Sequence, residues 1–119
     1  MISIKRKGEG EYIDFENCHG GAGTVHCLNM LNPEESEYGY QWFHYDRIPD
    51  GTTIAEHPHE KSEEIYYILE GEGTLIFDGV STPMGAGDIS MVSDGHSHGF
   101  ENNSGKDVIM IVVEIRPQI

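Results

Sequence analysis

The sequence predicts an all-β fold, either a sandwich or a barrel, and two observations support this. A series of short segments is rich in β-branched, aromatic and aliphatic residues, as β-strands are. Between them stand turn-forming residues such as Pro49-Asp50-Gly51, Asp78-Gly79 and Asn102-Asn103-Ser104-Gly105. Many short strands separated by turns are typical of sandwiches and barrels. The expected strands are residues 11–15, 24–31, 41–48, 52–59, 64–70, 73–78, 88–92, 96–101 and 107–115.

Two segments near the N-terminus are expected to lie outside the strands, the first of them as a flexible loop. Residues 20–24 are glycine-rich, but they lack the Lys-Ser/Thr ending and the following helix of a phosphate-binding loop. A plain loop is therefore the better interpretation. Residues 32–37, Asn-Pro-Glu-Glu-Ser-Glu, fit either a short helical turn or a loop.

The expected strand 41–48 has two faces of different chemistry. Alternation places Trp42, His44 and Asp46 on one face and Phe43 and Tyr45 on the other. Cores usually take the aromatic face, whereas the first face would give a pocket a polar edge. The sequence leaves both orientations open.

The next two strands carry candidate ligands for a metal ion. Alternation along 52–59 places the side chains of Thr53, Ala55, His57 and His59 on one face. Glu64 stands an odd number of positions after His59, so a turn is expected at Glu60-Lys61-Ser62. Glu64 then begins a new strand. Glu63 is an alternative ligand, because the spacer could be three or four residues.

Two further residues with candidate roles follow from strand alternation. Tyr66 shares a face with Glu64 and is expected to enter the barrel, either as a group that binds substrate or transfers a proton or as a packed aromatic. His96 shares a face with His98, which is the third candidate histidine ligand. His96 could then support the site, serve as a spare ligand or lie on the surface.

The candidate ligand set favours a transition metal. The imidazoles of His57, His59 and His98 with the carboxylate of Glu64 suit Fe, Mn, Ni, Co or Zn, whereas Ca and Mg prefer sites rich in oxygen. If the ion is octahedral, four protein ligands leave two positions for water, substrate or dioxygen.

These residues stand within two blocks that resemble the paired motifs of the cupin superfamily. The first block runs from Gly51 through His57-Pro58-His59 and Glu64 to Gly71, and the second runs from Gly87 through Asp94-Gly95 and His98 to Asn102. The six-residue distance to Gly71 favours Glu64 over Glu63. One departure is Ser93, where the family usually has proline, and its loss would loosen the turn before His98. Asn102 is expected to brace the strand end.

The resemblance implies a double-stranded β-helix, or jelly-roll barrel, as in small single-domain cupins of the conserved-barrel, cupin 2-like kind. It implies a metal-dependent enzyme acting on a small polar organic molecule, with dioxygenase, isomerase, lyase and decarboxylase chemistry all open. Tyr66 and His96 are then the candidate catalytic residues. The alternative is a non-catalytic module that binds a sugar or another small ligand.

Composition limits the partners and the compartment. The net charge of −14 disfavours nucleic acid and anionic membrane surfaces, which bind basic patches. The 119 residues suit one domain spanning residues 1–119. Because no apolar stretch follows the basic residues near Met1, no signal peptide is expected, and a cytoplasmic location is the default. Cys18 and Cys27 are expected to be reduced thiols rather than a disulfide.

Apolar residues on the expected outer face point to an assembly. Ile65, Tyr67 and Leu69 should face away from Glu64, and the run 108–113 is apolar on both faces. A strand that is apolar on both sides needs a cover on its outer face. Either the N-terminal strands in residues 1–31 fold over it, or a second subunit does. Small single-barrel cupins are commonly dimers that exchange N-terminal strands, so a homodimer is expected.

Overall fold

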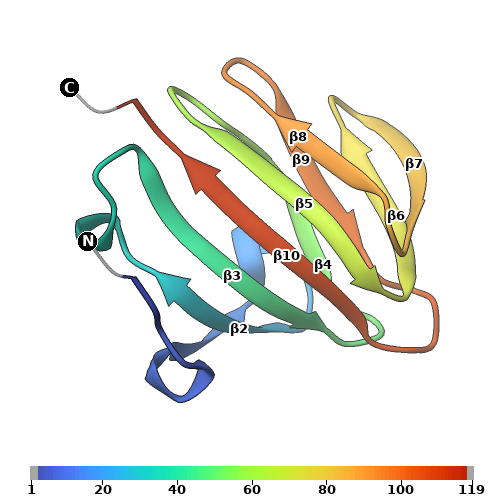
Figure 1. Cartoon of the computed structure of the whole chain (residues 1–119). Coiled ribbons are helices and arrows are strands. Elements are labelled where there is room, and N and C mark those ends of the chain that lie inside the picture. The colour runs from blue at the N-terminus through green and yellow to red at the C-terminus, as the bar shows by residue number, and fades with distance from the viewer. Residues whose placement is uncertain (1–2, 118–119) are drawn as a thin grey trace.

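The computed structural model describes residues 3–117, which form strands and three short 3-10 turns (Figure 1). The turns are η1 (Lys7–Glu9), η2 (Cys18–Gly20) and η3 (Pro33–Glu35). The strands are β1 (Glu11–Glu16), β2 (Thr24–Leu31), β3 (Tyr40–Ile48), β4 (Thr53–Pro58), β5 (Glu63–Glu70), β6 (Glu72–Phe77), β7 (Val80–Gly85), β8 (Ile89–Val92), β9 (Ser97–Glu101) and β10 (Val108–Ile115). Within residues 3–117, no helix has the length and apolar character needed to cross a membrane.

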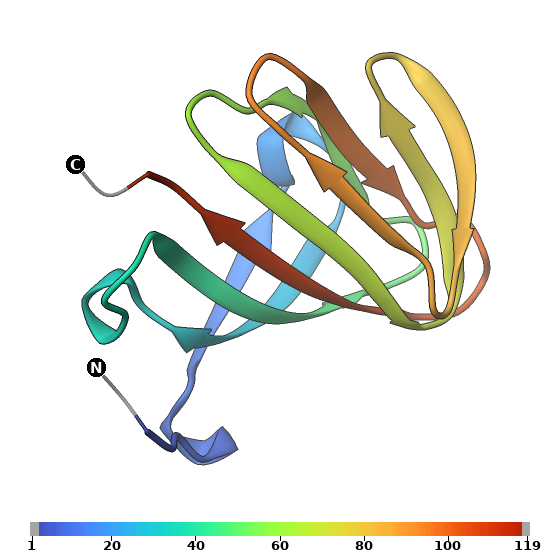
Figure 2. The ribbon, with the colours of Figure 1, turned by 45° about the horizontal axis from the view of Figure 1, so that its top comes forward.

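The strands make two antiparallel sheets. The larger has the order β1-β2-β3-β10-β5-β8, and the smaller has the order β4-β9-β6-β7. The smaller sheet lies behind the larger one in Figure 1, and the rotated view in Figure 2 shows the two as opposite walls. The fold is therefore the all-β, double-stranded β-helix that the sequence predicted.

β7 is the strand that the sequence did not predict. Its residues, Val80–Gly85, are mostly exposed, so they carry no alternation of apolar and polar side chains. It also contains Pro83, which lacks a backbone donor and is tolerated because β7 is an edge strand. Asp78 and Gly79, at φ values of 48° and 78°, form the tight turn that pairs β6 with β7. Such turns, with positive φ at both central residues, match the twist of a hairpin.

The core lies between the two sheets. Ile48, Ile68, Phe100, Val108 and Met110 have no exposed surface. Removing each of these side chains from water contributes about 1.5–3 kcal/mol. Their burial fixes which face of each strand looks into the barrel, and hence which polar residues are carried inside.

A β-bulge in β4 corrects the alternation expected from the sequence. Ile54 pairs with Phe100 of β9 and His57 pairs with His98, so β4 has one more residue than β9 between these pairs. The expectation that Thr53 and Ala55 share a face with His57 is wrong, because the extra residue reverses the alternation and Ile54 is the buried one. Gly99 faces the bulge, and a Cβ there would lie 2.6 Å from the carbonyl oxygen of Ile54.

The outer face of the larger sheet is not covered by the N-terminal strands. β1 and β2 extend that sheet at its edge, and β1 pairs with β2 of the same chain. Phe43, Tyr45, Tyr67 and Leu69 remain between 37% and 41% exposed. The sequence predicted that either the chain's own N-terminal strands or a second subunit would cover this face. Within residues 3–117, the N-terminal strands do not cover it.

Candidate metal centre

Four of the predicted site residues come together inside the barrel. One ligand atom from each of His57, His59, Glu64 and His98 lies within 4.8 Å of those of the other three, and all four side chains are buried. We call this set the first cluster. β4 supplies His57, and His59 follows directly after its end, while β5 supplies Glu64 and β9 supplies His98. Residues far apart in sequence therefore meet because the two sheets face each other.

Glu64 stands at the centre of the contacts within the first cluster. Its Oε1 atom lies 3.0 Å from Nε2 of His98 and 3.4 Å from Nε2 of His59. The ring of His98 lies edge-on to that of His57 at 4.8 Å and to that of His59 at 4.9 Å between centroids. The carboxylate and the imidazole nitrogens thus face one common point, as ligands of a single ion do.

Hydrogen bonds on the outer side of the rings set their orientation. Nδ1 of His57 donates to the carbonyl oxygen of Ala55 at 2.8 Å, inside the β4 bulge. Nδ1 of His59 lies 2.9 Å from Oγ of Ser62 and 3.4 Å from Oε1 of Glu114. Outer contacts of this kind leave Nε2 free for an ion and fix the ring against rotation.

Two properties of the first cluster fit a divalent ion. Nε2 of His59 is buried and makes no hydrogen bond, although Glu64 is nearby, and such an atom is costly to bury without a partner. Burial alone would raise the pKa of Glu64, but its contacts with His59 and His98 outweigh burial and lower the pKa to about 2. Burial lowers the pKa of His57 to about 4. Near neutral pH these two groups therefore have the protonation states that metal binding requires.

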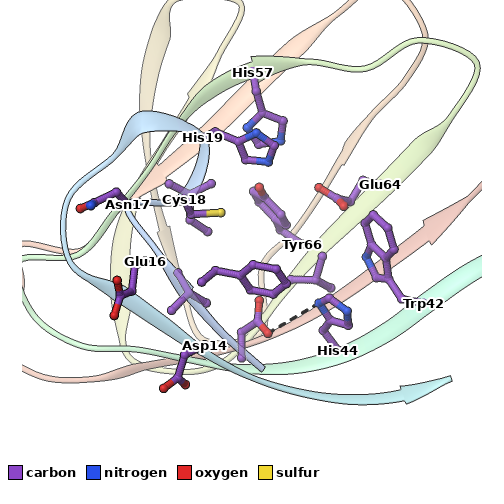
Figure 3. A pocket seen from close by; sticks show the side chains of 15 residues that line it. Asp14, Glu16, Asn17, Cys18, His19, Trp42, His44, His57, Glu64 and Tyr66 are labelled. Carbon is purple, nitrogen blue, oxygen red and sulfur yellow. Dashed lines mark ion pairs between the residues drawn. The ribbon is translucent and has the colours of Figure 1, made fainter. Parts of the chain in front are cut away.

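The first cluster opens onto a pocket of about 520 Å³ (Figure 3). His57 and Glu64 line one end of it, and His44 and Asp46 line another part of its wall. Apolar and aromatic side chains make up much of the remaining wall, namely Phe15, Val25, Trp42, Ile54, Tyr66 and Val112. A pocket of this size, apolar with a few polar groups, is typical of a small-molecule site.

Tyr66 enters the barrel and is buried there, as the sequence predicted. Its ring stacks on His98 at 4.2 Å between centroids, and only 2% of its surface is exposed. In the stick view its hydroxyl end points toward His19 (Figure 3). Burial raises the pKa of Tyr66 well above its usual value, so the hydroxyl stays protonated and can donate a hydrogen bond into the pocket.

The structure does not bring His96 to the first cluster. It precedes β9 and is exposed, and its Nδ1 atom lies 2.6 Å from Oδ2 of Asp78. It is also absent from the lining of the pocket, so a proton-transfer role for it gains no support from this geometry. Glu63 is likewise exposed and accepts a hydrogen bond from Ser93, which leaves Glu64 as the carboxylate of the cluster.

Two site residues were missed by the sequence reasoning. His19, in η2, stacks on the ring of His57 at 3.6 Å between centroids and lines the pocket. It has a φ of 53° in an irregular turn, so no periodic pattern could have indicated its position. Glu114 pairs opposite Glu64 across β10 and β5. The sequence could have indicated the position of Glu114, because strand alternation puts this acidic residue on the same face as the apolar Val108, Met110 and Val112, which are buried.

The other polar face expected from the sequence also lies inside. On β3, His44 and Asp46 are 8% and 5% exposed, whereas Phe43 and Tyr45 face outward. Trp42 stacks on His44 at 5.3 Å between centroids. Of the two orientations that the sequence left open for this strand, the structure shows the one that turns His44 and Asp46 toward the pocket.

The part of the chain that contains the first cluster matches a known protein family. The cupin domain model matches residues 44–114, which include the first cluster. An oxalate-binding protein of Thermotoga maritima is 35% identical over 101 residues, which are 85% of this chain and 84% of that protein.

Solved structures resemble the fold as well. A crystal structure of a predicted oxalate decarboxylase from T. maritima aligns with a TM-score of 0.89 and 32% identity, covering 96% of this chain and 99% of the other. A sugar phosphate isomerase of Silicibacter pomeroyi aligns with a TM-score of 0.67 and 23% identity, covering 77% of this chain and 59% of the other. This second likeness extends to the fold alone.

Proposed function

The chain belongs to the cupin family, and from this premise we propose that it binds a divalent transition metal and, on that ion, a small carboxylic acid such as oxalate. The proposed ligands are His57, His59, Glu64 and His98. The observation that carries the proposal is this buried cluster at the end of a pocket large enough for a small molecule. The oxalate-binding relative, similar over most of its length, supports the choice of ligand.

The bound ion and two residues of the pocket wall would each act on the acid. A bound dication supplies Lewis-acid attraction for a carboxylate oxygen. The protonated hydroxyl of Tyr66 can donate a hydrogen bond to a second oxygen of the acid. His19, stacked on His57 at the pocket wall, would shield the ligand from water.

The volume of the pocket bears on the choice of acid. Oxalate has six heavy atoms and would fill a small part of about 520 Å³. Larger acids with a carboxylate at one end and an apolar body therefore also fit the lining. Oxalate serves as the first probe, and pyruvate and malonate are the natural comparisons.

Turnover of the bound acid is a second candidate function. The buried, protonated hydroxyl of Tyr66 favours it. Decarboxylation of oxalate yields carbon dioxide and formate, and overall it adds one proton to the carbon that becomes formate. A buried hydroxyl that stays protonated beside His98 is a suitable hydrogen-bond donor or proton relay for such a reaction. Incubation with ¹³C-oxalate followed by NMR would detect formate if turnover occurs.

The test of binding uses metal analysis and titration together. Protein purified without chelator and supplemented with Fe, Mn, Ni, Co or Zn should contain about one ion in the first cluster and should bind oxalate in calorimetry. The His57→Ala/His98→Ala variant should lose both properties, whereas His96→Ala, which removes an exposed histidine, should keep both. Protein that takes up none of these metals would rule out the proposal.

We also propose that a second copy of the chain covers the outer face of the larger sheet. Phe43, Tyr45, Tyr67 and Leu69 expose aromatic and aliphatic surface there. Exposed apolar surface of this kind is typical of subunit interfaces. Light scattering coupled to size-exclusion chromatography should give the mass of a dimer, and Tyr45→Glu should shift it toward the monomer. A monomeric wild type at micromolar concentration would contradict the proposal.

A further inference from the structure

A second set of metal-binding residue types lies in the barrel, apart from the first cluster. Cys27 of β2 and His44 and Asp46 of β3 each offer one ligand atom, and these three atoms lie within 4.8 Å of one another. We call this set the second cluster. Cys27 pairs directly opposite Asp46 across the two strands. His44 lies two residues before Asp46, on the same face of β3. The three residues are 1%, 8% and 5% exposed, respectively.

Asp46 is incompletely satisfied within the second cluster. Its Oδ1 atom is buried and accepts no hydrogen bond, and the nearest imidazole nitrogen, Nδ1 of His44, is 3.9 Å away (Figure 3, dashed line). That distance is too long for a hydrogen bond. The adjacent cation, Arg47, points to the exposed Asp107 instead. An unpartnered carboxylate oxygen in the interior costs about 1–3 kcal/mol or more, so its retention calls for an occupant.

A metal ion suits this space better than an organic ligand does. Oδ1 of Asp46 has almost no accessible surface, so a ligand atom of ordinary size has little access to it. A small ion between the three side chains needs no such access, because it sits about 2.0–2.3 Å from each ligand atom. As in the first cluster, the ligand atoms of the second cluster all lie within 4.8 Å of one another.

We propose that Cys27, His44 and Asp46 form a second metal site, selective for Zn²⁺. A thiolate, an imidazole and a carboxylate are the three ligand types that Zn²⁺ takes in proteins. Three protein ligands leave a fourth position, and because His44 and Asp46 line the pocket, that position faces it. The site would place a second ion on the wall of the pocket that the first cluster also borders.

The thiolate distinguishes the two sites chemically. The first cluster contains nitrogen and oxygen ligands alone, which suit several transition metals. The second cluster contains a sulfur ligand, which favours Zn²⁺ and other thiophilic ions over Mn²⁺ or Fe²⁺. The second site could bind its ion whether or not the first cluster binds metal and oxalate, because its ligands lie outside the first cluster.

Cobalt provides a test, because a thiolate bound to Co²⁺ gives a sulfur-to-metal charge-transfer band in the near ultraviolet that histidine and carboxylate ligands do not give. Metal-free, reduced protein titrated with Co²⁺ should show this band. The band should persist in His57→Ala/His98→Ala and in Cys18→Ser, and it should vanish in Cys27→Ser. Elemental analysis after Zn²⁺ loading should find about two ions per chain in the wild type and about one in Cys27→Ser.

The outcomes separate this inference from the proposed function. If the wild type gives no sulfur-to-cobalt band, or if the band survives Cys27→Ser, the second site does not exist. If the band appears but His57→Ala/His98→Ala binds as much metal as the wild type, the second site stands and the proposed first site fails. Because Cys27 is buried, Cys27→Ser could unfold the chain. Asp46→Asn, which keeps the thiol and the side-chain shape, should then weaken Co²⁺ binding at least about tenfold with an unchanged circular dichroism spectrum.

Discussion

The first and second clusters each contain one buried carboxylate, yet the pKa values of the two carboxylates are shifted in opposite directions. Glu64 lies close to His98 and His59, and despite its burial their contacts lower its pKa to about 2. Asp46 has the Cys27 thiol as its donor, and burial raises its pKa to about 7. Burial alone therefore does not set the protonation state of a carboxylate. The strength and number of the donors that face it decide.

The difference has a consequence for metal binding. The first cluster already holds a carboxylate near neutral pH, so an ion can enter with little proton release from Glu64. The second cluster must lose the protons of Cys27 and Asp46, because burial raises the pKa of both groups. At the first cluster the contact with Glu64 raises the pKa of one ligand, His59. Metal binding at the second cluster, where two ligands have raised pKa values, should therefore weaken more steeply as the pH falls.

The largest effect is expected from removing the charge of the first cluster. Glu64→Gln keeps the shape of the side chain but replaces a carboxylate ligand with a neutral amide. Loss of an outer partner of a ligand costs about 10–100-fold in metal affinity, and loss of a charged ligand should cost more. Competition with a chelator of known affinity measures the change. Glu63→Gln, on the exposed neighbour, should leave affinity unaltered. Equal effects of the two variants would show that Glu64 is not a ligand.

The second largest effect is expected from the bulge beneath the first cluster. In Gly99→Ala the new Cβ would lie 2.6 Å from the carbonyl oxygen of Ile54 and 2.7 Å from the amide nitrogen of Glu56. Forcing a methyl group into such a space costs about 1–3 kcal/mol. The shift would also displace the Ala55 carbonyl that orients His57, so metal affinity at the first cluster should fall.

Urea unfolding and metal titration of Gly99→Ala would measure both quantities. Gly85→Ala is the matched control, because no atom lies within 4 Å of a Cβ there. It should change the free energy of unfolding by about 0.5 kcal/mol at most. The second cluster is on other strands, so its sulfur-to-cobalt band should survive Gly99→Ala. If Gly99→Ala lowers the free energy of unfolding but leaves the metal affinity of the first cluster unchanged, the bulge does not orient His57.

Much of this barrel could be predicted from the sequence because its determinants are local. Turn residues and apolar segments located every strand except β7, which lacks the alternation that marks a half-buried strand. The residues of the first cluster were also predicted, because their spacing is that of a family motif. The choice of Glu64 over Glu63 agrees with their burial, at 5% exposure for Glu64 and an exposed surface for Glu63.

The remaining features depend on contacts between distant strands. The bulge in β4 lies opposite Gly99 of β9, and the sequence of β4 by itself does not predict it. The second cluster depends on the register that sets Cys27 opposite Asp46. The alternation of His96 with His98 holds only within a strand, and β9 begins after His96, at Ser97. Of the positions left open for His96, the structure shows the exposed one.

The third prediction uses the raised pKa of Asp46. The folded chain keeps a proton on Asp46 up to about pH 7, whereas the unfolded chain loses it near its ordinary value of 3.8. Between these values the folded state binds more protons, so the contribution of Asp46 to stability is full below about pH 4 and is lost as the pH rises to 7. In metal-free protein this loss should reach about 2 kcal/mol between pH 5 and pH 7.

Asp46→Asn should remove that decline, because the amide does not titrate. Urea unfolding of both proteins at pH 5, 6 and 7 would show the variant gaining on the wild type as the pH rises. Glu37→Gln, at an exposed position away from the pocket, should follow the wild type. Parallel pH profiles for Asp46→Asn and the wild type would mean that Asp46 is already ionised in the folded chain. The contrast between the two carboxylates would then disappear.

The smallest effect is expected from the outer partner of His59. Ser62→Ala removes the hydroxyl that lies 2.9 Å from Nδ1, but Oε1 of Glu114 is 3.4 Å from the same nitrogen and can replace it in part. First-cluster metal affinity should therefore fall about tenfold, the lower end of the range for an outer partner. Ser93→Ala, which removes a hydrogen bond to the exposed Glu63, is the control and should leave affinity intact. If Ser62→Ala is silent but Ser62→Ala/Glu114→Gln is not, Glu114 is the partner that orients His59.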